Sequence, residues 1–325
     1  MTNTNKKNKN TRKLLGAIGM LSVSAAMLVS STFAWFTMNK TVQATNMRVQ
    51  AKADQGLLIN EVATAGDSNW DELATTNQTT GIQLHATSTA DTKTWYVAYS
   101  KKSNTAAAAA KGAASTDLTS DGYKTLGTAP FATAVSTVDA IAGSNAKQEI
   151  TYVDKDAGTD YDPGEGYYVK YTYYLKSSAD EITCSLDAGG QSLQIKNVAV
   201  TNNENVGVVD PVEDLDAALR VAIVINNKAY IYAPVTGATT SYYVNAGSTA
   251  TTTLSGDQAT AMTKIPSVTE NGTPVYVYLY FEGEDAKLKT DNVTSTLDNV
   301  TVSFDLSLVD NTAAATDNGV AVPST

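Results

Sequence analysis

Cysteine and histidine are almost absent from this sequence. Cys184 and His85 are the only residues of their types among 325. No intrachain disulfide is therefore possible, no His-Glu-x-x-His zinc site exists, and a Ser-His-Asp or Cys-His arrangement would depend on His85 alone. We interpret Cys184 as a buried strand residue and His85 as part of an exposed strand face, and we predict no catalytic residue. A two-carboxylate glycosidase is the enzymatic alternative that stays open, because its geometry is not visible in a sequence.

Basic residues are scarce outside the N-terminus. The chain has 23 Lys and Arg against 33 Asp and Glu, a net charge of −10. Five of the basic residues precede position 14, and no acidic residue occurs before Asp54. Loss of residues 1–34 would therefore leave a net charge of −15. A surface this acidic repels nucleic acid and anionic lipid, so we expect neither as a partner of the mature chain.

Long apolar runs are absent except for Leu14 to Phe36. The order of basic residues, apolar segment and small residues is that of a secretory signal, which predicts cleavage after Ala34 and Trp35 as the mature N-terminus. The run is also just long enough for a permanent membrane anchor, which is the main alternative. A type IV pilin leader fits less well, because such segments keep a glutamate near their start. We expect a secreted protein at the cell surface or in a biofilm matrix, with membrane contact only through the signal segment before cleavage.

Residues 32–37, Thr-Phe-Ala-Trp-Phe-Thr, resemble the processing site of exported proteins cut by a signal peptidase of the SipW type. The type members are the TasA fibre proteins of biofilm matrices and the related camelysins. Residues 218–223 and 280–285 are similar to stretches of the same proteins, so the resemblance covers the signal and 212–310. It implies export through a SipW-type peptidase and noncovalent self-association into pilus-like filaments by donor-strand complementation. Camelysins have been described as proteases, but no zinc site is present here to support that activity.

Alternating apolar and polar residues predict many β-strands. Gly166 to Lys176 places Tyr167, Tyr171 and Tyr173 on one face, a tyrosine-rich inner face. The phase of alternation changes near Lys196-Asn197, which predicts a β-bulge. Asn226-Asn227 between two apolar runs predicts a hairpin. Eight or more such strands with little helix predict an all-β fold, a jelly-roll-like β-sandwich with long loop insertions, preceded by an N-terminal signal helix.

The pattern also predicts how the chain is divided. We expect a signal peptide at 1–34, an N-terminal donor-strand segment at 35–55, a β-sandwich domain at 56–310 with a low-complexity insertion at about 103–147, and a flexible tail at 311–325.

One acidic loop has the spacing of a calcium ligand set. Its carboxylates occupy places 1, 3, 7, 9 and 12 of a twelve-residue window and are Asp154, Asp156, Asp160, Asp162 and Glu165. Oxygen-rich loops of this kind bind Ca²⁺. Gly158 and Thr159 depart from the EF-hand pattern, and strands flank the loop, so a solvated acidic hairpin is the alternative. We expect no other cofactor.

The predicted mature N-terminus is unusually apolar for a free chain end. Its apolar side chains are Trp35, Phe36, Met38 and Val42. An extended segment of this kind binds an open sheet edge, and if that edge belongs to the next subunit the contact produces a filament. We therefore expect a structural subunit of an extracellular fibre. Two alternatives stay open: the segment folds back on its own domain, or the protein is a monomeric adhesin or carbohydrate-binding module that uses its tyrosine faces.

Overall fold

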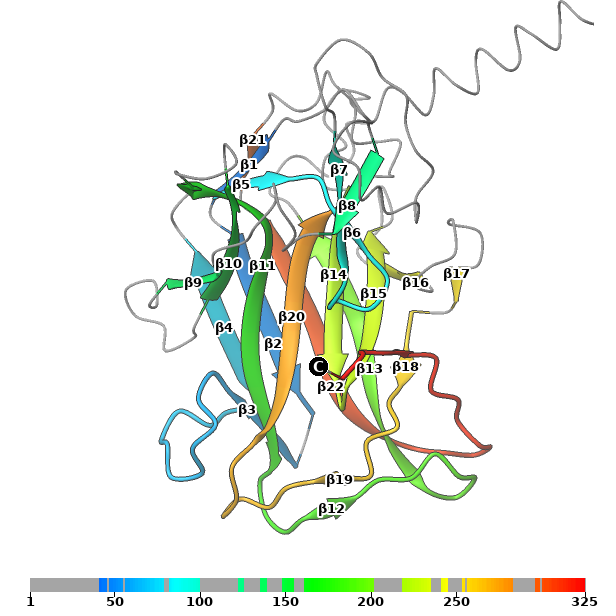
Figure 1. Cartoon of the computed structure of the whole chain (residues 1–325). Coiled ribbons are helices and arrows are strands. Elements are labelled where there is room, and N and C mark those ends of the chain that lie inside the picture. The colour runs from blue at the N-terminus through cyan, green and yellow to red at the C-terminus, as the bar shows by residue number, and fades with distance from the viewer. Residues whose placement is uncertain are drawn as a thin grey trace, which may run out of the picture.

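The computed structural model describes residues 41–45, 47–54, 56–78, 82–99, 122–125, 135–138, 148–154, 161–201, 218–234, 241–244, 253–254, 256–282, 296–298 and 300–324. Within these residues the regular structure is almost entirely β-strand, and two sheets pack face to face (Figure 1). The prediction of an all-β sandwich is confirmed. In the described ranges no helix is long and apolar enough to cross a membrane, and Leu14 to Phe36 lie outside those ranges.

The large sheet forms the front layer in Figure 1. Its main path runs in the order β17 (Thr253–Leu254), β16 (Ser241–Val244), β15 (Lys228–Pro234), β14 (Leu219–Ile225), β20 (Thr273–Phe281), β11 (Tyr161–Ser177), β5 (Ile82–His85), β1 (Thr41–Thr45) and β21 (Thr296–Asp298). Four further strands join beside this path: β3 (Leu57–Asn60) and β10 (Gln148–Asp154) on β11, β9 (Val135–Val138) on β10, and β23 (Val320–Ala321) on β15.

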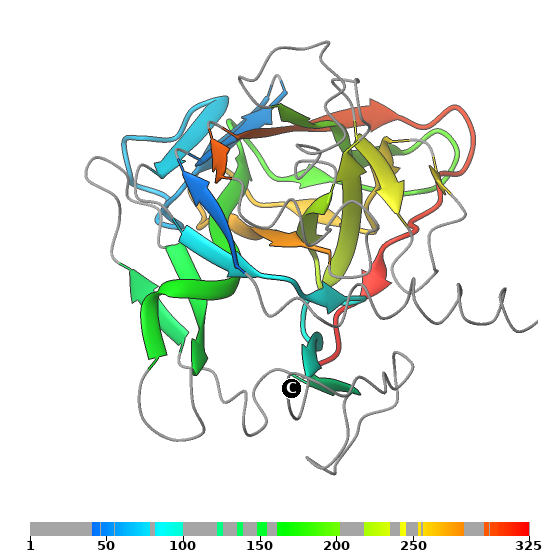
Figure 2. The same ribbon diagram turned by 90° about the horizontal axis from the view of Figure 1, so that it is seen from above.

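The small sheet forms the rear layer, with the order β18 (Gln258–Ala259), β13 (Gln191–Thr201), β22 (Thr301–Asp310), β2 (Met47–Ala53) and β4 (Leu73–Gln78). The chain passes between the layers repeatedly, for example from β2 to β3, from β3 to β4, from β11 to β13 and from β21 to β22. Such exchange is typical of jelly-roll-like sandwiches. Two short sets of strands complete the fold: β6 (Ser88–Thr89), β7 (Trp95–Tyr99) and β8 (Gly122–Thr125), and the pair β12 (Ile182–Thr183) and β19 (Lys264–Ile265). Figure 2 shows that β6 to β8 lie outside the sandwich, on the side of the large sheet.

The core lies between the two sheets, and the predicted inner face of β11 takes part in it. Tyr171 and Tyr173 are fully buried, and Tyr167 is 4% exposed. Tyr173 donates a hydrogen bond from its hydroxyl to Thr76 Oγ1 at 2.8 Å, and its ring meets Phe304 edge-on. The tyrosine hydroxyl therefore has a partner where burial would otherwise be costly.

Two local predictions are confirmed by the backbone. The pairing of β13 with β22 shifts register between Lys196 and Ala199, and Asn197 has a φ of 51°, which places the bulge where the alternation changes phase. Asn226 and Asn227 have φ values of 51° and 58° and join β14 to β15 as a two-residue turn. Asparagine tolerates this left-handed conformation, which the twist of a tight hairpin requires.

Other predicted features have a mixed outcome. Within the predicted insertion 103–147 only 122–125 and 135–138 are described, and both are strands. Cys184 is buried as expected, but it follows β12 and is not itself in a strand. The predicted tail is traced from 311 to 324 and returns along the sandwich, where β23 pairs with Lys228 and Ala229 of β15.

Candidate functional site

The predicted calcium loop joins β10 to β11. Asp154 ends β10 and is paired with Tyr161, while Asp162 and Glu165 lie in the first part of β11. Asp156 and Asp160 fall outside the described residues. No group of three or more His, Cys, Asp or Glu in the described ranges is placed to hold a metal ion. Calcium binding by this hairpin stays a prediction.

The predicted donor segment is divided between residues the structure does not describe and two strands of this chain. Trp35, Phe36 and Met38, with the cleavage residue Ala34, are outside the described ranges. Val42 lies in β1 and is paired with Leu84 of β5. In the rear sheet β2 runs parallel to β22 and antiparallel to β4, and its inward side chains are at most 2% exposed. Residues 47–53 are therefore part of the sandwich core, and a segment available for donation must precede them.

The edge strand β4 has backbone groups that are not paired with another described strand. It ends the rear sheet and is paired only with β2 among the described strands (Figure 1). Ala53 N donates to Glu72 O, so the hydrogen-bonded pairs of this antiparallel ladder place residues 74, 76 and 78 toward β2. The backbone N–H and C=O groups of Leu73, Thr75 and Asn77 then point to the open edge.

This edge carries none of the usual protection against pairing. Strand β4 reads Leu-Ala-Thr-Thr-Asn-Gln, without a charge or a proline, and Leu73 is 51% exposed. Natural proteins commonly place lysine, proline or a bulge on an exposed edge, because its free backbone groups accept another strand. The strands at the ends of the main path of the large sheet, β17 and β21, and at the other end of the small sheet, β18, have only two or three residues.

A second feature is an aromatic cluster on the outward face of the large sheet. Trp95 of β7 stacks on Tyr168 with ring centres 4.2 Å apart, meets Tyr280 edge-on at 5.1 Å and lies 5.9 Å from Tyr278. The indole N–H donates to Thr92 O at 3.0 Å. Burial raises the pKa of Tyr280, although Arg220 opposes this effect. Trp95 thus fastens the segment with β6 and β7 onto β11 and β20.

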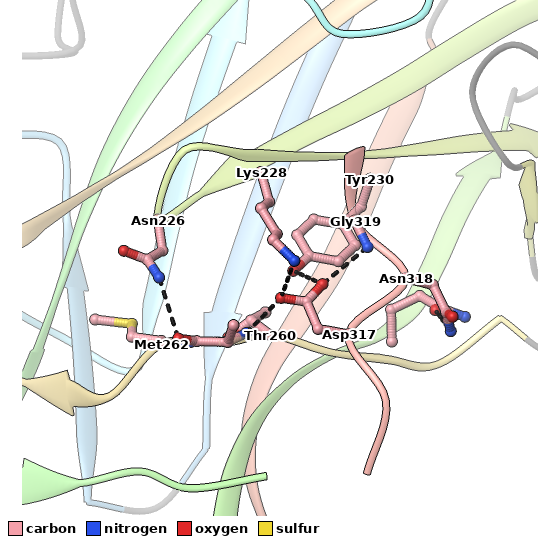
Figure 3. A network of polar contacts seen from close by, with 10 residues as sticks. Asn226, Lys228, Tyr230, Thr260, Met262, Asp317, Asn318 and Gly319 are labelled. Atoms are coloured by element: carbon pink, nitrogen blue, oxygen red, sulfur yellow. Dashed lines mark hydrogen bonds and ion pairs between the residues drawn. The ribbon is translucent and has the colours of Figure 1, made fainter. Parts of the chain in front are cut away.

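One buried carboxylate, that of Asp317, is a fixing point of the C-terminal segment in addition to the pairing of β23 with β15 (Figure 3). Asp317 Oδ1 accepts hydrogen bonds from Tyr230 OH and Gly319 N, both at 2.8 Å. Its Oδ2 accepts from Ala261 N at 2.8 Å and forms an ion pair with Lys228 Nζ at 3.0 Å. The Asp317 side chain is 5% exposed and that of Lys228 is 32% exposed. The buried carboxylate is therefore satisfied by donors from three segments that are distant in sequence.

Near the C-terminal end of β11, a buried lysine side chain joins two loops by hydrogen bonds. Lys176 is 1% exposed and donates to Ala65 O at 3.0 Å and Val268 O at 3.2 Å. Its Nζ also lies 4.0 Å from the ring centre of Trp70. Burial lowers the pKa of Lys176, and Asp67 opposes that shift. The alternation of apolar and polar residues in β11 predicts that Lys176 lies on the outward face of the sheet. The loop that carries Trp70 covers it there.

Cys184 and His85 are the two residues that the sequence analysis considered for nucleophilic chemistry. Burial raises the pKa of the Cys184 thiol, which disfavours the reactive thiolate. His85 lies in β5, paired with Thr41.

The sequence did not predict that Asp317, Trp95 and Lys176 hold distant segments of the chain against the sandwich. Thr-Asp-Asn-Gly at 316–319 is a turn signature that would have found Asp317, because aspartate side chains often accept from the backbone two residues on. No comparable local signal marks Trp95 or Lys176, whose partners are far away in sequence.

Comparison with protein-family models, with curated proteins and with solved structures found no match. The likeness to TasA and camelysin proteins therefore depends on the sequence motifs alone.

Proposed function

We propose that this protein is a structural, non-enzymatic subunit of an extracellular filament or biofilm-matrix fibre, exported through a SipW-type signal peptidase. Its subunits join without covalent bonds when the N-terminal segment of one chain pairs with a sheet edge of the next. The observation that carries the proposal is the open, uncharged edge of β4, whose outward backbone groups belong to Leu73, Thr75 and Asn77. An edge of this kind is a template for an added strand.

The donor in this proposal is the short segment 35–40. The chain's own β1 begins at Thr41, and β2 is an interior strand of the rear sheet, paired with β22 and β4. Donation of either strand would cost the subunit its own pairing. Residues 35–40 precede both strands and include the aromatic pair Trp35-Phe36. Main-chain hydrogen bonds along β4 would supply affinity, and the side chains of 35–40 would supply specificity. A head-to-tail contact of this type repeats without closing, which gives a filament.

A proline substitution tests the acceptor edge. The N–H of Thr75 points away from β2, so Thr75→Pro removes an outward donor and leaves the β2–β4 ladder intact. Thr75→Val keeps the N–H and serves as the matched control. Under this proposal, negative-stain microscopy of the secreted mature protein shows fibres for the wild type and Thr75→Val and single folded particles for Thr75→Pro. Fibres of unchanged length and number from Thr75→Pro would exclude β4 as the acceptor.

Deletion of residues 35–40 tests the donor separately. The shortened chain keeps β1 and β2, so its β-type circular dichroism spectrum should match that of the full mature chain while its fibres are lost. Persistent polymerisation would show that another surface joins the subunits. Single particles from the wild-type chain would favour a monomeric surface protein instead.

A further inference from the structure

The chain contains two Asn-Gly dipeptides, Asn271-Gly272 and Asn318-Gly319, and both lie in described parts of the structure. In such a dipeptide the backbone nitrogen of the glycine can attack the side-chain amide carbon of the asparagine, because glycine has no side chain to obstruct the approach. A five-membered succinimide forms, and the amide nitrogen leaves as ammonia. The rate of this reaction in a folded protein depends on the groups that surround each dipeptide.

The two sites differ in the atom that accepts the glycine N–H. The glycine nitrogen becomes a good nucleophile only when it loses its proton. Gly319 N donates to Asp317 Oδ1 at 2.8 Å, whereas Gly272 N donates to Ala63 O at 3.0 Å. An aspartate carboxylate is ionised at neutral pH and can take up a proton, but a peptide carbonyl is not basic enough to do so. Asp317 therefore lies where a general base for Gly319 N would have to lie.

Other contacts fix the Asp317 carboxylate in this position. Tyr230 OH donates to the same oxygen at 2.8 Å, and Ala261 N and Lys228 Nζ contact the other oxygen at 2.8 Å and 3.0 Å (Figure 3). The side chain is 5% exposed, so little water competes with the glycine N–H. A positioned general base contributes about 10²–10⁴ to a rate. Because these donors reduce the basicity of the carboxylate, we expect an effect at the lower end of that range.

The Asn318 side chain is accessible to the water that completes the reaction. Residue 318 is exposed, although its Nδ2 donates to Gln258 Oε1 at 3.0 Å. Water can therefore reach a succinimide at this position. The base lies on the buried side of the dipeptide, and the solvent lies on the other side.

We propose that Asn318-Gly319 is a self-modifying site in which Asp317 is the base. Asp317 accepts the proton of Gly319 N, and this nitrogen attacks Asn318 Cγ to form a new Cγ–N bond. The bond from Cγ to Nδ2 then breaks, and the proton passes from Asp317 to the departing group, which leaves as ammonia. One water molecule hydrolyses the succinimide, either at Cγ to give aspartate or at the main-chain carbonyl to give isoaspartate.

The isoaspartate product loosens the C-terminal segment. It adds one methylene to the main chain directly before β23, which pairs in register with Lys228 and Ala229. The segment has no spare room here, because a Cβ added to Gly319 would lie 2.6 Å from Tyr230 Cζ. Both products also place a second carboxylate next to Asp317, and like charges repel. The site thus acts as a slow and irreversible release of the C-terminal segment, which is separate from strand donation at β4.

The first test compares the folded mature protein with the same protein unfolded in guanidinium chloride, at the same neutral pH and temperature. Peptide mass spectrometry that distinguishes isoaspartate from aspartate follows conversion at both dipeptides. In the unfolded chain the two should convert at similar rates. In the folded protein Asn318 should convert about tenfold faster than in the unfolded chain, whereas Asn271 should convert more slowly. Slower conversion of Asn318 in the folded protein would overturn the proposal, because the fold would then protect the site.

Asp317→Asn tests the base itself. Asparagine has a similar size but cannot take up the proton, so conversion of Asn318 should fall to the rate of the unfolded chain or below it. Asp310→Asn changes an exposed aspartate that accepts from Gln191 and should leave the rate unchanged. Circular dichroism and thermal unfolding show whether each variant is folded, and the comparison of folded with unfolded wild type does not depend on either variant. Equal conversion in Asp317→Asn and the wild type would overturn the role of Asp317.

Hydrogen exchange of fresh and aged wild-type protein tests the consequence. Exchange across residues 311–324 should become faster in proportion to the isoaspartate fraction at position 318. Exchange that stays the same in fully converted protein would overturn the release of the segment.

Discussion

Replacement of Asp317 should release the C-terminal segment and destabilise the sandwich. Asp317→Ala removes the hydrogen bonds that the carboxylate accepts from Tyr230 OH, Ala261 N and Gly319 N, and it removes the ion pair with Lys228. A hydrogen bond to a charged group contributes about 1.5–3 kcal/mol. The three bonds are not additive, because the freed segment exposes some of these donors to water, and the ion pair adds little since Lys228 is a third exposed.

The expected loss for Asp317→Ala is therefore about 3 kcal/mol of unfolding free energy. At about 2–4 °C per kcal/mol this lowers Tm by roughly 6–12 °C. Asp310→Ala is the matched control, because Asp310 is an exposed acceptor for Gln191 and should change stability by less than about 0.5 kcal/mol. Urea denaturation measures both variants, and hydrogen exchange should speed up across 311–324 in Asp317→Ala only. A loss below about 1 kcal/mol with unchanged exchange would refute the role given to this carboxylate.

Three other predictions concern buried polar groups and the acidic loop. Lys176→Met keeps the aliphatic stem but leaves two loop carbonyls unpaired, so urea denaturation should show a loss of about 1–3 kcal/mol, and no loss would contradict the loop contacts. Burial raises the pKa of Tyr171, Tyr173 and Tyr280 above the ordinary value of 10.0. Below pH 10 these groups are protonated in both states. Above pH 10 these tyrosines ionise only in the unfolded chain, so the free energy of unfolding should fall by about 1.4 kcal/mol per pH unit for each tyrosine. Tyr171→Phe should reduce this pH dependence by the share of one tyrosine. An unchanged pH dependence would count against the burial of the Tyr171 hydroxyl. Calorimetry should detect Ca²⁺ binding to residues 154–165 at a Kd of about 10⁻⁴ to 10⁻³ M. The binding heat should disappear when Asp154 and Asp156 are replaced by asparagine. Equal heats in both proteins would exclude this loop as the calcium site.

Sequence alone was a good guide to the strands with strong alternation. The inner face of β11, the bulge at Asn197 and the turn at Asn226-Asn227 follow from local rules, since side chains alternate with period two and asparagine tolerates positive φ. These features depend on neighbours in the chain. They are therefore visible without knowledge of the other sheet.

Features created by contacts between distant segments were not predicted. Asp317 sits in a small, polar tail that the composition alone marked as flexible, yet its partners come from β15 and the stretch after β18. Lys176 has the phase of an exposed residue and is buried only because a loop near Trp70 folds over it. The openness of β4 likewise depends on the order of strands in a sheet, which alternation does not determine.

A cryo-electron microscopy structure of fibres grown from the mature protein tests the central claim most directly. The proposed function predicts a repeating head-to-tail contact in which residues 35–40 of one subunit form a strand along the β4 edge of the next. The main-chain groups of Leu73, Thr75 and Asn77 would be paired across that contact. A fibre in which the β4 edge faces solvent, or in which residues 35–40 pack on their own subunit, would contradict strand donation.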